Sequence, residues 1–307
     1  MYAPSQTNTL SETPYSPATE FSLSVQQLTD EDRNEVLDFL TERPIHTVCM
    51  VGFIRDNGFE SAFNRGRFYA CRNVDGRLEG VALIGHTTLV EARTNRAIKE
   101  FALLAQTCSN TFVIMGEQES IEQFWNYYAD EGQDIGLIWR ELLFELRRAL
   151  PLQATVPGLR RATLNDLELI APVHAEMAQA ESGVNPLVTD PSGFRQRCAR
   201  RIEKGRVWVV VENGQLHFKA DIQADTPDVI YLEGIYVHPA KRGQGLGRLC
   251  LSQLTQTFLR SSKAVCLLAN ENNEKAHSLY RLSNFKLRGS YYTTFLQSKT
   301  RLVAITL

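Results

Sequence analysis

The segment Arg242-Gly-Gln-Gly-Leu-Gly-Arg248 places three glycines at alternate positions between two arginines. Glycine lets a backbone turn sharply and approach a ligand without a clash from a Cβ atom. The apolar positions that follow predict a helix over Leu246–Phe258, whose first N–H groups would point back at this turn. Unpaired N–H groups and two guanidinium groups favour a bound anion, so we expect a pyrophosphate site here.

Two other nucleotide-binding loops do not fit this segment. The glycines of residues 243–247 are spaced as Gly-x-Gly-x-Gly, which differs from the Gly-x-Gly-x-x-Gly of dinucleotide-binding folds. A P-loop would need Gly-Lys followed by Ser or Thr at the helix start, and this sequence lacks it. The preceding strand, expected over Val229–Val237, also comes late in its half of the chain, after a helix and a hairpin.

Two motifs in the C-terminal half resemble, in order, those of the GNAT acetyltransferases. In that family a strand ending in Val-x-Pro leads to Gln or Arg, with Gly and then Gly or Ala three and five positions later. Arg242, Gly245 and Gly247 match this pattern. The second motif, Asn-x-x-Ala-x-x-Leu-Tyr, is matched by Asn273, Ala276, Leu279 and Tyr280, and Asn284-Phe285 stands where the family has Gly-Phe. The resemblance covers residues 159–307 and implies an α/β GNAT fold with a mixed sheet.

The resemblance also implies how acetyl-CoA would bind. In GNAT folds the strand corresponding to Leu232–Val237 bulges and splays from the next strand, and the pantetheine arm pairs with its backbone in the gap. The helix that begins near Asn273 contacts the cofactor close to the pantetheine. The implied cofactor-binding residues are Ile235, Tyr236, Val237, Arg242, Gly243, Gln244, Gly245, Leu246, Gly247, Arg248 and Asn273.

Two residues are candidates for catalysis. Tyr280 would be the general acid that protonates the departing thiolate, and the alternative is a tyrosine packed in the core. Glu233 would be the general base, because an amine must lose a proton before it attacks a thioester. The alternative for Glu233 is a salt bridge to a neighbouring Arg or Lys. We read His238 as a surface residue and the basic run Arg195–Arg206 as a solvated helix face.

The first half alternates strand and helix patterns but contains no glycine-rich loop. It is similar to the degenerate GNAT-like half of tandem acetyltransferases, although this likeness is less specific. Two prolines and a glycine after an expected helix over Trp139–Leu150 predict a linker. We therefore expect a disordered tail (1–20), an N-terminal mixed α/β domain (21–150), a linker (151–158) and a GNAT domain (159–307). Tyr291–Leu296 and Leu302–Leu307 are expected as closing strands.

Composition limits the remaining function classes. A formal net charge of −2 over 307 residues does not suggest a nucleic-acid partner, and 43% hydrophobic residues suit an ordinary globular chain. No apolar run reaches the roughly 20 residues that span a bilayer. The six cysteines form no Cys-x-x-Cys pair and the histidines are scattered, so we expect neither disulfides nor a metal site. These features favour a cytoplasmic protein.

The hypothesis that follows is direct transfer of an acetyl group from acetyl-CoA to a primary amine, with no covalent enzyme intermediate. The acceptor is a small molecule, a protein N-terminus or a lysine, and a longer acyl donor also fits. The alternative is a catalytically weak acyl-CoA sensor or regulatory protein. A third possibility is that the first half recruits a macromolecular substrate. The sequence carries no signal for the oligomeric state.

Overall fold

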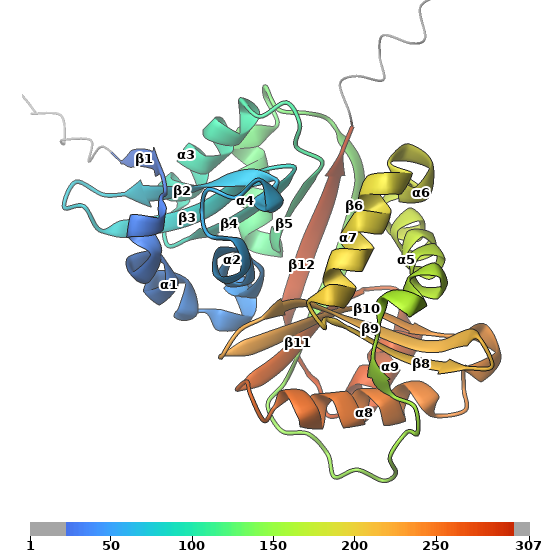
Figure 1. Ribbon diagram of the computed structural model, residues 1–307. Coiled ribbons are helices and arrows are strands. Elements are labelled where there is room, and N and C mark those ends of the chain that lie inside the picture. The colour runs from blue at the N-terminus through green and yellow to red at the C-terminus, as the bar shows by residue number, and fades with distance from the viewer. Residues whose placement is uncertain (1–22, 298–307) are drawn as a thin grey trace, which may run out of the picture.

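The computed structural model describes residues 23–297 and has one mixed sheet at its centre (Figure 1). The strand order is β1-β2-β3-β4-β5-β12-β6-β11-β10-β9-β8-β7. The strands are β1 (Ser24–Gln27), β2 (Gly66–Arg72), β3 (Leu78–Gly85), β4 (Thr87–Ala92), β5 (Val113–Glu117), β6 (Ile135–Leu146), β7 (Arg160–Arg161), β8 (Val207–Glu212), β9 (Gln215–Asp225), β10 (Val229–Val237), β11 (Ala264–Asn270) and β12 (Lys286–Leu296). The expected α/β class with a mixed sheet is confirmed.

Helices lie on both faces of this sheet. They are α1 (Arg33–Thr41), α2 (Pro44–Asn57), α3 (Asn95–Gln106), α4 (Gln118–Tyr128), α5 (Leu167–Ser182), α6 (Pro186–Thr189), α7 (Pro191–Glu203), α8 (Leu246–Phe258) and α9 (Glu274–Leu282). Single 3-10 turns are η1 (Asp30–Asp32), η2 (Ala62–Asn64), η3 (Leu164–Asp166) and η4 (Pro239–Lys241). Within residues 23–297, no helix is both long and apolar enough to cross a bilayer. The tail expected at 1–20 and the strand expected at Leu302–Leu307 lie outside the described residues.

Most elements of the C-terminal half form where the residue pattern predicts them. Asn213 and Gly214 join β8 to β9, and their φ angles of 50° and 73° are the left-handed values that a two-residue hairpin turn requires. β10 covers the expected Val229–Val237, and α8 covers the expected Leu246–Phe258. The expected strand–turn–helix unit is therefore confirmed.

β6 and β12 exchange places between the two halves of the chain. β6 comes from the N-terminal half but pairs with β11 of the C-terminal half. β12 pairs with β6 on one side and with β5 of the N-terminal half on the other. Figure 1 shows the two strands side by side at the centre, β6 in green and β12 in red. The division at residues 151–158 stays a prediction, and the sheet is continuous across it.

The expected helix over Trp139–Leu150 is wrong, because Ile135–Leu146 forms β6. Phe144 is buried towards α8 and α9, whereas Leu143 is buried on the opposite face, in the cluster that α2 covers. A strand covered on both faces does not alternate between apolar and polar residues. The Leu, Glu and Arg residues of this segment also have high helix propensity, which strand pairing on both sides overrides.

The connection over residues 151–158 contains neither helix nor strand and lies along α8. The Val156 N–H donates to Oε1 of Gln253 at 2.8 Å, and Nε2 of Gln256 donates to the carbonyl of Leu150 at 2.8 Å. Val156 is buried in the same core cluster as α8. The expected linker is thus held against the C-terminal half by specific contacts.

Helix α2 of the N-terminal half covers part of the C-terminal half. Val48 packs in one cluster with Tyr231 of β10 and Cys266 of β11. The backbone of Gly52 lies so close to β9 that a Cβ atom there would be 2.6 Å from the Cβ of Ala224. A larger residue at position 52 would push α2 away from the sheet. An N-terminal helix therefore forms one wall beside β10.

Candidate active site

β10 and β11 separate at the middle of β10. They pair in parallel only from Val229 opposite Ala264 to Leu232 opposite Leu267. The register between β10 and β9 then shifts between Glu233 and Tyr236. The bulge and splay expected over Leu232–Val237 are therefore present, and within residues 23–297 the backbone of residues 235–237 has no partner strand on the β11 side.

Gly234 makes this bulge possible. Its φ of 59° lies in the left-handed region, which residues other than glycine rarely adopt. A Cβ atom there would lie 2.8 Å from both Nζ of Lys219 and Oδ2 of Asp221. Both the backbone conformation and the neighbouring charges therefore require glycine.

The loop after β10 leaves open space in front of α8. Gly243 and Gly245 have φ angles of 75° and 83°, and a Cβ atom at either position would meet no atom of the described part of the chain within 4 Å. Nε of Arg242 donates to the Val237 carbonyl at 3.0 Å, and Nε2 of Gln244 donates to the Ala240 carbonyl at 2.7 Å. These bonds hold the loop in a turn whose outer side is free for a ligand.

The N-terminus of α8 has no side-chain cap, because its N-cap residue is Gly245. The first N–H groups of any helix lack intrahelical partners, so those of α8 are available to an external acceptor. Gly247 lets this helix start close to the strand, since a Cβ atom there would lie 3.0 Å from Cγ2 of Val237. The loop and helix together have the features of an anion site.

The second motif forms the start and the body of α9. Oδ1 of Asn273 accepts a hydrogen bond from the Ala276 N–H at 3.1 Å, so this side chain caps the helix. Tyr280 is buried, with its ring centroid 5.6 Å from that of Phe144 and 5.9 Å from that of Phe285. Burial raises the pKa of Tyr280 to about 12, which keeps its hydroxyl protonated at neutral pH. Both the acid role and the packed-core interpretation of Tyr280 stay open.

Glu233 lies at the bulge and forms an ion pair. Its Oε1 accepts from Nη1 of Arg201 at 2.7 Å, and its side chain is about one-third exposed. The same Nη1 lies 3.4 Å from Oδ2 of Asp221, which also accepts from Lys219 at 2.5 Å. The salt bridge considered from the sequence is thus present, and the base role of Glu233 stays a prediction.

His174 joins this network from α5. One possible ligand atom from each of His174, Asp221 and Glu233 lies within 4.8 Å of the others. However, Arg201 and Lys219 already pair with the two carboxylates. A bound cation would therefore meet two positive charges, so we assign no metal to this group.

Two carboxylates that the sequence analysis missed contribute to the same electrostatic environment. Burial raises the pKa of Glu141 on β6; a hydrogen bond from Thr293 opposes this shift, and the charge of Glu233 adds to it. Desolvation by the surrounding protein, followed by the charges of Glu233 and Glu141, raises the pKa of Glu181 on α5 to about 7, although part of this side chain remains exposed. These three residues are far apart in sequence, so no spacing pattern could have grouped them. Glu141 and Glu181 form no ion pair among residues 23–297, so when ionised they add negative charge near Glu233 that Arg201 does not offset.

Residues 203–287 match the family model described as "Acetyltransferase (GNAT) domain". The C-terminal half contains a GNAT domain. Three solved structures match most of the chain, and their likeness shows the fold alone. They are a GNAT-family acetyltransferase from Colwellia psychrerythraea (13% identity, TM-score 0.55, covering 89% of this chain and 100% of that one), a tandem GNAT protein from the clavulanic acid biosynthesis pathway (15%, 0.56, 90% and 98%), and a Drosophila protein (13%, 0.59, 90% and 99%). No curated protein sequence matches the chain.

In the N-terminal half, β4 and β5 separate as β10 and β11 do, but the loop and the side chains around them differ. β4 and β5 also pair in parallel only briefly, from Thr87 opposite Val113 to Leu89 opposite Met115. The turn into α3 is short, and Oγ1 of Thr94 caps that helix by accepting from the Ala97 N–H at 3.3 Å. The N-terminus of α3 is therefore partly satisfied and lacks the glycine loop that precedes α8.

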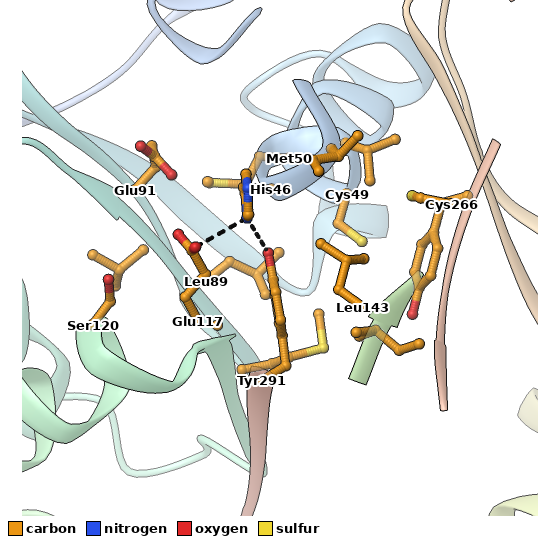
Figure 2. A pocket seen from close by; sticks show the side chains of 17 residues that line it. His46, Cys49, Met50, Leu89, Glu91, Glu117, Ser120, Leu143, Cys266 and Tyr291 are labelled. Carbon is orange, nitrogen blue, oxygen red and sulfur yellow. Dashed lines mark hydrogen bonds and ion pairs between the residues drawn. The ribbon is translucent and has the colours of Figure 1, made fainter. Parts of the chain in front are cut away.

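Side chains occupy the space beside β4 and β5 (Figure 2). Nδ1 of His46 lies 2.8 Å from the hydroxyl of Tyr291 and 3.2 Å from Oε1 of Glu117. Arg43 pairs with both Glu117 and the buried Glu91. The remaining cavity is about 40 Å³, enough for a few water molecules. This polar cluster leaves no space there for a pantetheine arm.

Proposed function

We propose that the GNAT domain transfers an acetyl group from acetyl-CoA to a primary amine. Two features together support this proposal. β10 separates from β11 at Gly234, and the open loop over residues 238–245 leads into α8, whose N-terminus has no side-chain cap. In this proposal the N–H groups of residues 243–248 and the guanidinium groups of Arg242 and Arg248 hold the pyrophosphate. The backbone of Ile235–Val237, which pairs with β9 on one side only, binds the pantetheine arm on its β11 side as an added strand would.

The chemistry needs the amine, the thioester and two proton-transfer groups in one place. Glu233 takes the proton of the ammonium group, directly or through water, and the amine nitrogen then bonds to the carbonyl carbon. A backbone N–H in residues 235–237 stabilises the charge that develops on the carbonyl oxygen, an effect worth about 3 kcal/mol. As the carbon–sulfur bond breaks, the hydroxyl of Tyr280 donates its proton to the thiolate. The nitrogen loses its second proton as the amide forms, and that proton restores the Tyr280 hydroxyl through solvent.

The functional test is thiol release from acetyl-CoA with a panel of primary amines. We expect Tyr280→Phe to lower kcat by about 100-fold while acetyl-CoA binding, measured by calorimetry, stays unchanged. Tyr128→Phe is a matched control, because Tyr128 is also a buried tyrosine but lies in the N-terminal half. Full activity of Tyr280→Phe would support the packed-core interpretation. Tight binding without thiol release for any amine would favour the sensor hypothesis.

The carboxylates near β10 predict a pH effect on the acceptor. Because the pKa of Glu181 is raised to about 7, this residue becomes neutral as the pH falls through 7. The site then loses negative charge, so the KM for the cationic amine should rise at lower pH. Glu181→Gln should raise this KM at pH 8 and remove its change near pH 7, whereas Glu233→Gln should lower kcat. Steady-state kinetics from pH 6 to 9 measures both effects, with Glu119→Gln as the control, because Glu119 is also exposed but lies on α4. The role of Glu181 is wrong if Glu181→Gln keeps the wild-type KM profile.

A further inference from the structure

A groove of about 280 Å³ lies between α2 of the N-terminal half and α7 of the GNAT domain. Its walls contain one carboxylate, Asp56, and six cations. These are Arg65, Arg197, Arg200, Arg201, Lys204 and Arg206. The basic run that we read as a solvated helix face therefore partly lines a concave surface between the two halves.

Carboxylates neutralise only part of this charge. Asp56 pairs with Arg206 and Lys204, and Arg197 and Arg201 pair with other acids. Among the described residues, Arg65 and Arg200 have no carboxylate oxygen within 4.0 Å. Arg200 instead lies over the ring of Phe63, 3.4 Å from its centroid, and donates to Oδ1 of Asn57 at 3.3 Å. Two guanidinium groups thus line the groove without an anion.

The pKa values of Arg65 and His86 reflect the positive charge of the groove. Partial burial, and then the charge of Arg197, lower the pKa of Arg65. Burial, followed by the charges of Arg65 and Arg197, lowers the pKa of His86 to about 4, so this histidine is neutral. Its Nδ1 is buried and has no hydrogen-bond partner among residues 23–297. An anion in the groove would relieve the repulsion between the arginines.

The inner end of the groove reaches the proposed acceptor site. Arg201 lines the groove, and its Nη1 lies 2.7 Å from Oε1 of Glu233. One side chain therefore separates the basic groove from the carboxylate that we assign to the amine. A ligand with a positive group at Glu233 and a negative group in the groove would match both charges.

We propose that the groove between α2 and α7 binds an anionic group, a phosphate or a carboxylate, of the acetyl acceptor. Arg65 and Arg200 supply the contacts, because a guanidinium group can form two parallel hydrogen bonds to such a group. The inference rests on the proposed function and gives its acceptor class, primary amines that also carry an anionic group. It also gives the N-terminal half a role, since Arg65 and one wall of the groove come from it.

Three amines with the same aminoethyl group test this inference: phosphoethanolamine, β-alanine and ethanolamine. Charged hydrogen bonds of this kind contribute about tenfold or more each, so two arginines should make kcat/KM favour at least one anionic amine over ethanolamine by about 100-fold. A preference for phosphoethanolamine over β-alanine would identify the anion as phosphate, and the reverse as carboxylate. Equal values for all three amines would overturn the proposal.

Arg65→Gln and Arg200→Gln should each lower kcat/KM for the preferred anionic amine about tenfold and leave ethanolamine unchanged. Arg195→Gln is the matched control, because Arg195 lies on α7 but does not line the groove. An equal loss for charged and neutral amines in the Arg65 and Arg200 variants would overturn the role of the groove.

Calorimetric titration with phosphoethanolamine and β-alanine separates this inference from the proposed function. Binding of either ligand that is lost in Arg65→Gln/Arg200→Gln, without thiol release from acetyl-CoA, would support the anion site and contradict acetyl transfer to these amines. Thiol release with ethanolamine, together with no binding of either anionic ligand, would support the transferase and contradict the anion site.

Discussion

A Gly245→Glu variant is expected to bind acetyl-CoA on the order of 100-fold more weakly than the wild-type protein, a loss of about 2.7 kcal/mol. Gly245 is the N-cap of α8, with a φ of 83°, and the space beside it is open. A glutamate there would strain the backbone and place a negative charge where we propose that the pyrophosphate lies. Calorimetric titration with acetyl-CoA measures the change.

Gly76→Glu separates loss of the site from loss of the fold. Gly76 has a φ of 79° and open space around it, but it lies in the turn between β2 and β3. Both variants carry the same strain and charge, so only Gly245→Glu should lose acetyl-CoA. Wild-type affinity in Gly245→Glu would place the cofactor elsewhere. No binding to the wild-type protein would favour a regulatory role over the enzyme.

The fragment 151–307 is expected to be insoluble or unfolded when expressed alone, despite containing the whole match to the GNAT model. It lacks β6, so β11 loses one of its partner strands and the core loses the fully buried Phe144. It also lacks α2, which covers Tyr231 and Cys266. A missing buried aromatic residue alone typically costs about 3–5 kcal/mol, a large part of the stability of a domain.

Coexpression tests which part of the N-terminal half is needed. Fragment 1–150 supplies both β6 and α2, so it should form a soluble complex with 151–307 that binds acetyl-CoA. Fragment 1–134 supplies α2 without β6 and should fail. Gel filtration, circular dichroism and calorimetry distinguish these outcomes. Cooperative unfolding and acetyl-CoA binding by 151–307 alone would contradict the requirement for the exchanged strand.

Local patterns in the sequence predicted the parts of the fold that local physics determines. The hairpin at Asn213-Gly214, β10 and α8 all follow from turn residues, strand length and helical spacing. The bulge over Leu232–Val237 came from the family resemblance, and the geometry at Gly234 supplies its physical cause. The functional roles of the site residues remain predictions.

Features that depend on long-range pairing could not be predicted in this way. The segment of β6 was predicted as a helix because the end of this strand, residues 143–146, is buried on both faces and does not alternate, and that error removed Glu141 from consideration. Glu181 acquires its raised pKa from burial and from charges on two distant strands. The anion groove likewise needs Arg65 and Arg200, which only the folded chain brings to one surface.

The exchange of β6 and β12 has a consequence for the order in which the protein folds on the ribosome. β5 and β6 follow each other in the chain, but β12 lies between them in the sheet. Until residues 286–296 have been synthesised, β5 keeps an open edge and its core cluster lacks Leu296. Domains commonly fold one after another during translation, and open edges promote aggregation. We therefore expect neither half to be complete before β12 emerges, because this strand pairs with β5 of one half and its Tyr291 joins the core cluster beside β10 and β11.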